Sequence, residues 1–164
     1  ITRHMGRALY GSVTSLVEKM GNGETLVLDF EGVKVIDSSF VDEFIVRLIL
    51  DSMGFERPFY VKLKNVSEIS EMNIDMVLRS HSKYKNKKIV VITENICHTN
   101  AFFIGPLSDR EREFIEFIRV NRSVMTGDVA RFTGRTVEDV EAMMDQCHAM
   151  RIVKKDVNGV YSAV

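Results

Sequence analysis

The feature that most constrains the fold is an alternation of short β-rich runs with segments of helical periodicity across residues 1–93. Residues 89–93, Ile-Val-Val-Ile-Thr, form a continuous apolar run that is typical of a strand buried on both faces. The other segments of this half are helical at residues 9–20, 38–53 and 67–78 and strand-forming at residues 26–30, 33–36 and 59–63. Because helices and strands alternate, we expect an α/β layer fold.

Two of these segments, and the basic stretch before the last strand, carry more specific predictions. Residues 26–30 and 33–36 flank Glu31-Gly32, which predicts two strands around a tight turn. Residues 83–88 contain four lysines, and we expect them to form a solvated loop that leads into the buried strand. This basic loop also offers a surface that could attract an acidic partner.

The pattern changes beyond Asn95, where turn-forming residues give way to a helix-dominated tail. We place a domain boundary near Pro106 because composition and periodicity both shift there. This boundary predicts an α/β domain with its linker at residues 1–105 and a smaller domain at residues 106–164.

The smaller domain has a recognisable order of elements. Ser108 and Glu111 form a capping-box pattern at the start of one helix, and two further helices are expected at residues 126–134 and from Thr136 onward. Asn158-Gly159 then lies between two β-rich runs and predicts a type I′ hairpin. Three helices followed by a hairpin is the order of a winged helix-turn-helix domain.

Composition and charge exclude several classes of protein. The chain has 164 residues, with 22 basic against 23 acidic side chains, so it is not a nucleic-acid binder by overall charge. Its apolar runs are shorter than the roughly 20 residues of a membrane-spanning helix, and no N-terminal segment resembles a signal peptide. Cys97 and Cys147 are too few for a disulfide framework. We therefore expect a reduced cytoplasmic protein.

The smaller domain is acidic where a DNA-reading winged helix is usually basic. Residues 106–164 carry nine Lys and Arg against ten Asp and Glu, and phosphate repulsion would oppose binding to a duplex. The candidates for a small DNA-binding patch are Arg131, Arg135, Lys154 and Lys155. Binding to another protein is the competing use of the same scaffold, and we favour it slightly over DNA.

Residues 26–44, Leu-Val-Leu-Asp-Phe-Glu-Gly-Val-Lys-Val-Ile-Asp-Ser-Ser-Phe-Val-Asp-Glu-Phe, are the most informative stretch of the chain. This segment resembles the STAS superfamily, the fold of anti-sigma-factor antagonists, and more closely a STAS-like family of unknown function. In those proteins a strand ends in Asp-Ser-Ser and runs directly into a helix, as Asp37-Ser38-Ser39 does here. The resemblance covers residues 5–93 and implies a STAS-like mixed sheet with helices.

The resemblance also implies a switch residue and a partner. In antagonist STAS domains the serine that matches Ser39 is phosphorylated by a kinase with the ATPase fold of histidine kinases, so Ser39 is the candidate phosphorylation site and Ser38 the second choice. Phe40 stands where antagonists usually have glycine, and its ring would either block a kinase or be the contact itself. The simpler alternative is that Asp37-Ser38-Ser39 only caps the helix, since Asp and Ser are preferred N-cap residues.

The helix that follows the motif has three faces on an α-helical wheel. Its core face consists of Val41, Phe44, Ile45 and Leu48, and its solvated face consists of Glu43, Arg47 and Asp51. Val46 and Leu50 lie outside both faces, so they are either covered by another part of this chain or open to a partner. Asp37, Phe40, Val46 and Leu50 are therefore the candidate partner-binding residues.

Catalysis, cofactors and metals find little support in the sequence. Cys97-His98 and Cys147-His148 could in principle form a metal site, but adjacent residues point in different directions, and we expect no metal. We expect Cys147 to be a core residue and His148 an exposed neighbour. No nucleophile is associated with a base and an orienting group, so the chain is not expected to be an enzyme.

Together these observations predict a non-catalytic prokaryotic signalling protein. Its STAS-like domain would bind a protein partner, with control by phosphoserine, and its winged helix would deliver the output. The alternative is a DNA-binding transcriptional regulator whose STAS-like domain forms a homodimer or senses a small molecule. Neither hypothesis involves a membrane.

Overall fold

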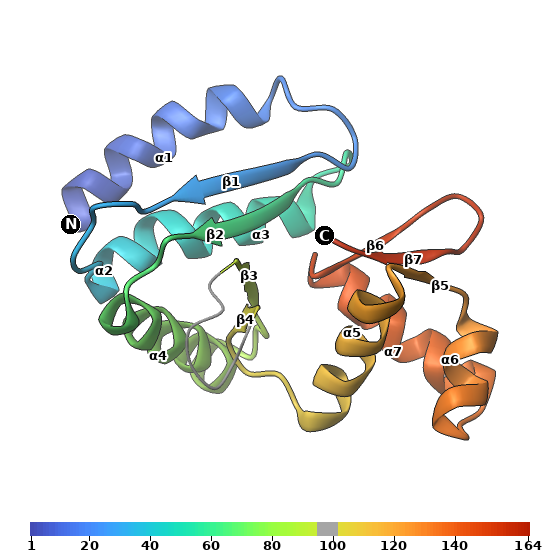
Figure 1. Ribbon diagram of the computed structural model, residues 1–164. Helices are drawn as coiled ribbons and strands as arrows, with labels where there is room; N and C mark the ends of the chain where they lie inside the picture. Colours follow the sequence, from blue (N-terminus) through green and yellow to red (C-terminus); the bar gives the residue numbers. More distant parts are fainter. Residues whose placement is uncertain (95–101) are drawn as a thin grey trace. The chain divides into compact units, whose positions relative to one another are not determined.

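The computed structural model describes residues 1–94 and 102–164 and divides into two compact units, Ile1–Pro106 (unit 1) and Leu107–Val164 (unit 2) (Figure 1). Cys97 and His98, one half of the metal site considered above, lie outside the described residues. Within the described residues no cluster of three or more metal-binding side chains occurs. In the same part of the chain, no helix is both long enough and apolar enough to cross a membrane.

Unit 1 is a mixed α/β structure built on a four-stranded sheet with strand order β1-β2-β3-β4. The first three strands are parallel, and β4 is antiparallel to β3. In chain order the elements are α1 (Arg3–Val17), β1 (Thr25–Asp29), α2 (Ser38–Phe40), the π-helical turn η1 (Val41–Val46), α3 (Arg47–Gly54), β2 (Tyr60–Lys64), α4 (Glu68–Lys85), β3 (Val91–Thr93) and β4 (Phe103–Ile104). The strands at residues 26–30, 59–63 and 89–93 are thus confirmed to within two residues at each end.

The core of unit 1 is formed by apolar residues from the sheet and from the helices packed on it. The fully buried members include Phe40, Ile45, Leu48, Leu63, Ile74, Leu78 and Ile89. They come from α2, η1, α3, β2, α4 and the segment that leads into β3. The predicted helices and strands of unit 1 therefore share one continuous core.

The predicted second strand at residues 33–36 is wrong. Among the described residues this segment pairs with no strand, because polar side chains at the start of α4 bond its backbone groups instead. Ser67 donates from Oγ to the carbonyl of Lys34 (2.7 Å), Ser70 Oγ accepts from the amide of Ile36 (2.9 Å), and Asn73 donates from Nδ2 to the carbonyl of Ile36 (2.8 Å). These bonds satisfy groups that a ladder would otherwise pair, and they fix the segment that enters α2.

The helix at α4 runs seven residues beyond the predicted end at Leu78. Asn86 ends it in the left-handed conformation, with φ 49°. Lys83 and Lys85 therefore lie in the last turn of α4 and not in a solvated loop. In that turn their positive charges interact favourably with the negative end of the helix dipole. The prediction of a loop holds for the residues after Asn86 alone.

Unit 2 contains, in order, α5 (Asp109–Asn121), β5 (Ser123–Val124), α6 (Thr126–Thr133), α7 (Val137–Ala149), β6 (Val153–Lys155) and β7 (Tyr161–Ala163). The three strands form an antiparallel sheet with the order β5-β7-β6. The predicted capping box is present, because Ser108 accepts from the amide of Glu111 while the Glu111 carboxylate accepts from the amide of Ser108. Cys147 is buried as predicted, but His148 is only partly exposed and hydrogen-bonds to the carbonyl of Val153.

The hairpin between β6 and β7 differs from the predicted type I′ turn. That turn needs positive φ at both central residues, and only Gly159 has it (φ 76°). Asp156 organises a longer connection instead, because its carboxylate accepts from the amides of Asn158 (2.8 Å) and Val160 (2.9 Å). An Asx-type side-chain bond of this kind competes directly with the two-residue turn.

Gly6 is a point of close approach between α1 and the α2–η1 segment. A Cβ at this position would lie 3.3 Å from Phe40 Cδ2, the Phe40 carbonyl and Glu43 Cβ, and Phe40 is fully buried and cannot move aside. Replacing Gly6 with alanine is therefore expected to destabilise the protein by about 1–3 kcal/mol through overpacking, less what alanine gains in helix propensity. Urea unfolding followed by circular dichroism measures this change.

The matched control for this substitution is Gly11→Ala in the same helix. Gly11 is exposed and has no atom within 4 Å of the added Cβ, so alanine is expected to stabilise α1 by up to about 1 kcal/mol. If both substitutions stabilised the protein equally, the close packing of α1 on Phe40 would be wrong.

Candidate functional site

The candidate site lies where the chain enters α2. Asp37 is the N-cap of this helix, and its carboxylate Oδ1 accepts hydrogen bonds from the amide of Phe40 and from the hydroxyl of Ser39, both at 2.8 Å. These two bonds hold the pKa of Asp37 below its usual range, and the bond from the Phe40 amide has the larger effect. The helix-cap interpretation of the motif is thus confirmed for Asp37, while phosphorylation of Ser39 or Ser38 stays a prediction.

Removing the cap tests this geometry. Asp37→Ala is expected to lower the free energy of unfolding by about 1 kcal/mol at pH 7, because the Phe40 amide loses its acceptor. The lowered pKa means that the carboxylate stabilises the folded state fully above its unfolded pKa, and that this contribution is lost as the pH falls through the folded pKa. The difference between wild type and variant should therefore shrink below about pH 4.

Asn is the conservative control at position 37, since it caps as well as Asp but carries no charge. Urea unfolding at pH 7 and pH 3 should show a smaller loss for Asp37→Asn than for Asp37→Ala at each pH. Both losses should shrink by the same amount toward pH 3, because the wild-type carboxylate is the group that titrates. A loss for Asp37→Ala that is equally large at both pH values would contradict a role for the ionised carboxylate.

A surface groove of about 350 Å³ opens beside the motif. Its lining comes from three separate helical segments, namely the start of α1, the α2–η1 junction and the second half of α4: Arg3, Ser38, Ser39, Asp42, Val77, Ser80, His81 and Lys85. Both candidate phosphorylation sites therefore face the same groove, together with two permanent cations. Here we call this the serine groove.

His81 and Asp42 form the polar wall of the serine groove. His81 Nε2 lies 2.7 Å from Asp42 Oδ1, and Lys85 Nζ lies 3.3 Å from the same histidine nitrogen and 4.0 Å from the Asp42 carboxylate. The side chain of His81 is only 9% exposed, whereas that of Lys85 is 61% exposed. The Asp42 carboxylate thus contacts both the His81 imidazole and the Lys85 ammonium group.

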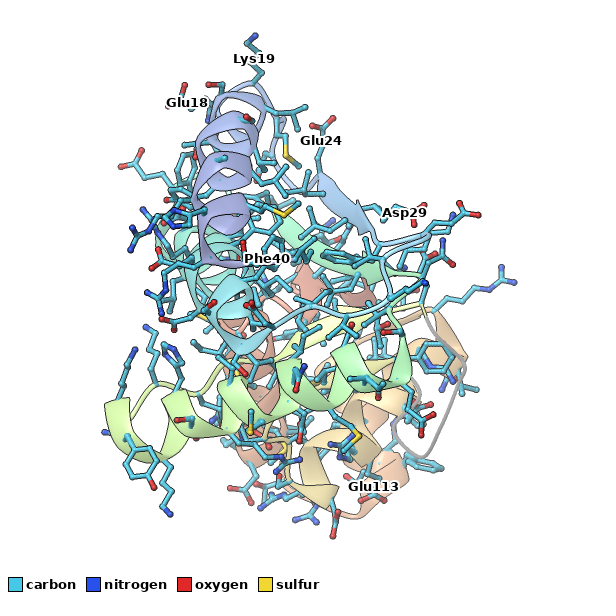
Figure 2. All side chains as sticks on the ribbon, turned by 90° about the vertical axis from the view of Figure 1, so that its left-hand side faces the viewer. Glu18, Lys19, Glu24, Asp29, Phe40 and Glu113 are labelled. Carbon is cyan, nitrogen blue, oxygen red and sulfur yellow. The ribbon has the colours of Figure 1, made fainter. Side chains whose placement is uncertain are left out.

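Phe40 points away from the groove and into the core. Its side chain is 0% exposed and packs against Phe30 and Phe44, with ring centroids 6.4 and 5.3 Å apart. Figure 2 shows Phe40 where α1 and α2 meet, which agrees with its contact to Gly6. The assignment of Phe40 as a partner-binding residue is therefore corrected: the ring neither blocks the serines nor offers a surface to a partner.

The candidate strip at Val46 and Leu50 is also corrected. Val46 is 2% exposed and belongs to the core, and Leu50 is partly buried against it. Two features explain the error. A π-helical turn holds more residues than an α turn, so η1 rotates the following side chains away from their α-helical positions. The helix α1, which packs on η1, contributes Val17 to the same core.

The predicted solvated face of this helix is a polar contact with α1. Glu43 accepts from Arg3 at 2.7 Å and from Arg7 at 3.0 Å, and Arg47 lies 3.8 Å away. The hydrogen bond from Arg7 is the main reason why the pKa of Glu43 is lowered. Tyr10 completes the contact by donating to Asp51 at 2.6 Å.

Sequence reasoning did not place Arg3, Asp42, His81 or Lys85 in this site, although Lys85 belongs to the basic stretch at residues 83–88. A signal for two of them was present. If the helical spacing had been continued past Leu78, His81 and Lys85 would have fallen three and seven residues on, along one face of the helix. No sequence pattern indicates that Arg3 lies beside this face.

The candidate DNA-binding residues of unit 2 are partly engaged within the unit. Arg131 pairs with Asp128 at 2.8 Å, and the Arg135 guanidinium lies 5.9 Å from the centroid of the Phe114 ring. Lys154 is partly buried at the start of the hairpin. The four residues come from α6, the loop after it and β6.

Lys155 is the most strongly held of these residues. Its ammonium donates to Asp145 at 2.6 Å, and this bond, together with Tyr161, raises the pKa of Lys155. Burial raises the pKa of Asp145, but the bonds from Lys155 and Tyr161 outweigh this effect and lower it. Lys155 therefore fastens the hairpin to α7, where it is not free to meet a phosphate.

Comparison with known proteins gives one match. No curated protein and no solved structure matches this chain. The one match covers most of α1, together with β1, the motif, the helix after it and β2, and it is shorter than the resemblance expected over residues 5–93. Residues 6–68 match the family described as a STAS-like domain of unknown function (DUF4325).

Proposed function

We propose that this chain is a non-catalytic prokaryotic signalling protein in which a STAS-like domain, unit 1, binds a protein partner under phosphoserine control. The observation that carries the proposal is the serine groove: Ser38 and Ser39 line an open surface hollow while the bulky Phe40 is turned into the core. The acceptor hydroxyls are therefore accessible despite the aromatic ring beside them. Charged groups on the groove wall supply polar contacts for a partner surface.

The proposed partner is a kinase with the ATPase fold of histidine kinases. In the switching step Ser39 Oγ attacks the γ-phosphorus of ATP, the bond to the bridging oxygen breaks, and ADP leaves. The hydroxyl proton passes to a base of the kinase or to water. A dianionic group at the rim of the groove would then repel any acidic partner surface seated there and weaken the complex.

A photo-crosslinking amino acid at position 80 tests whether a partner occupies the groove. Ser80 is exposed and lines the groove without contributing to the helix cap. In the full chain expressed in its natural host, this probe should give a discrete adduct with one protein, and Ser39→Asp should reduce the yield several-fold.

The control position for the crosslinker is Lys19. This residue is exposed just beyond α1 and projects away from the rest of unit 1 (Figure 2). Equal adducts from positions 19 and 80, or an adduct from position 80 that Ser39→Asp leaves unchanged, would contradict the proposed switch.

For unit 2 we propose a winged-helix domain that contacts a protein. The order of its elements, helix, strand, two helices and a hairpin, supports this assignment. The exposed residues of α7 include Glu138, Asp139 and Glu141, which disfavour a DNA phosphate backbone. Phe132 is 65% exposed and stacks on Phe117 with ring centroids 4.4 Å apart, which gives the unit an apolar surface instead.

The alternative output, a DNA-binding regulator, is favoured by the same element order, because winged helices commonly read DNA. A mobility-shift assay of the full chain at low salt separates the two. We expect no shift of a duplex. A shift that Arg131→Gln and Arg135→Gln abolish would favour the DNA-binding alternative, in which unit 1 dimerises or senses a small molecule.

A further inference from the structure

We propose that the serine groove is a receiving site for a phosphate monoester, in which Arg3, His81 and Lys85 bind the dianion. This proposal rests on the proposed function for one source of the phosphate, namely a phosphate carried on Ser39. The same chemistry would also accept a free phosphate-bearing molecule. The observation behind this proposal is that two serine hydroxyls and three basic side chains, from α1 and α4, line one groove of about 350 Å³.

Arg3 is available to a phosphate because its present partner has other cations. The Glu43 carboxylate is surrounded by three guanidinium groups, from Arg3 at 2.7 Å, Arg7 at 3.0 Å and Arg47 at 3.8 Å. If Arg3 turns toward the groove, Glu43 keeps Arg7 and Arg47. The Arg3 side chain is also 49% exposed, so little packing is lost when it moves.

Lys85 and His81 supply positive charge on the opposite wall. Asp42 is the single carboxylate among the residues that line the groove, and it is shared between His81 and Lys85. The lining therefore carries two permanent cations and one imidazole against one carboxylate. Lys85 has a flexible stem and can follow a phosphate, whereas the nearly buried His81 is held in place against Asp42.

The geometry at Asp37 directs a phosphate on Ser39 into this site. Ser39 Oγ now donates to Asp37 Oδ1 at 2.8 Å, and phosphorylation removes that proton. The dianion then lies beside the Asp37 carboxylate, which the Phe40 amide still holds in place, and the like charges repel each other. Rotation toward Arg3 and Lys85 relieves the repulsion, so phosphorylation would rearrange charges within unit 1 itself.

The test uses the full chain with phosphoserine incorporated at position 39 by genetic code expansion, so that no kinase is needed. A ³¹P NMR pH titration should give a second phosphate pKa below the ordinary value of about 6, by roughly half a unit or more, because nearby cations favour the dianion. Arg3→Gln and Lys85→Gln should each move this value back toward that of a phosphoserine peptide.

The matched control is Lys87→Gln, since Lys87 is exposed two residues from Lys85 but does not line the groove. It should leave the phosphate pKa unchanged. A value equal to that of the free peptide, or one that Lys87→Gln moves as much as Lys85→Gln does, would overturn the assignment for the covalent source.

A second arm tests the free source with inorganic phosphate as the probe. Titration of the unmodified chain, followed by the ring signals of His81, would show saturable shifts that Lys85→Gln weakens several-fold if the groove takes a free phosphate. A response in either arm supports the receiving site and identifies its source, and no response in both overturns it. Neither arm involves a partner, so these results are independent of the crosslinking experiment. If the groove binds no phosphate in either arm while Ser39→Asp still reduces crosslinking, the receiving site is refuted and the proposed function is not.

Discussion

Replacing Phe40 with alanine is expected to lower the free energy of unfolding by about 3–5 kcal/mol, the usual cost of deleting a fully buried phenyl ring. The ring packs against Phe30, Phe44 and the backbone of α1 at Gly6, so no neighbour can collapse into the vacated space without moving a helix. This loss would appear in the amide hydrogen exchange of β2 in the full chain, where global opening is measured directly.

Tyr84→Ala is the control for the Phe40 substitution. Tyr84 is an aromatic residue that is 74% exposed, and its removal should cost no more than about 0.5 kcal/mol. If Phe40→Ala were equally mild and instead weakened partner binding, Phe40 would be a contact residue, and the placement of its ring in the core would be wrong.

Gly105→Ala is expected to be nearly as damaging, with a loss of about 3 kcal/mol or more. Gly105 has φ 126°, a conformation that residues with a side chain rarely adopt. A Cβ there would also lie 2.7 Å from the carbonyl oxygen of Ile89 and 3.1 Å from Val90 Cα, which are backbone atoms that cannot turn away. The substitution would separate β4 from β3 and break the bond from the Gly105 amide to Asp75.

The matched control here is Gly127→Ala, because Gly127 lies in α6 and a Cβ would meet no atom within 4 Å. Urea unfolding of both variants by circular dichroism gives the comparison. A loss for Gly105→Ala that is no larger than that for Gly127→Ala would contradict the close approach of the chain at β4.

The elements of this protein were predictable where one short pattern determines them. The buried strand predicted at residues 89–93 is present as β3 over Val91–Thr93, and the capping box at Ser108 and Glu111 is present as predicted. Both depend on neighbouring residues alone. The segment at residues 33–36 was not predictable, because Ser67, Ser70 and Asn73 of a later helix determine where its backbone groups are bonded. A strand-like sequence remains unpaired when side chains offer its amides and carbonyls other partners.

The candidate site was predictable in its motif but not in its surroundings. Asp37, Ser38 and Ser39 were identified from their order, and Asp37 does cap the helix. Phe40 was misjudged because its role was inferred from the glycine that antagonists usually have at this position, and the sequence does not show that α1 packs against this side chain. Arg3, which approaches from α1, lies 35 residues or more away in sequence, and only the tertiary structure brings it beside the serines.

The proposed switch requires that Ser39 is phosphorylated in the cell. The most direct measurement is peptide mapping by mass spectrometry of the full chain isolated from its natural host under conditions in which the partner kinase is present. We predict a phosphate on Ser39, absent from a Ser39→Ala chain isolated in the same way. A chain that is unmodified at both Ser39 and Ser38 under those conditions would contradict the proposed switch.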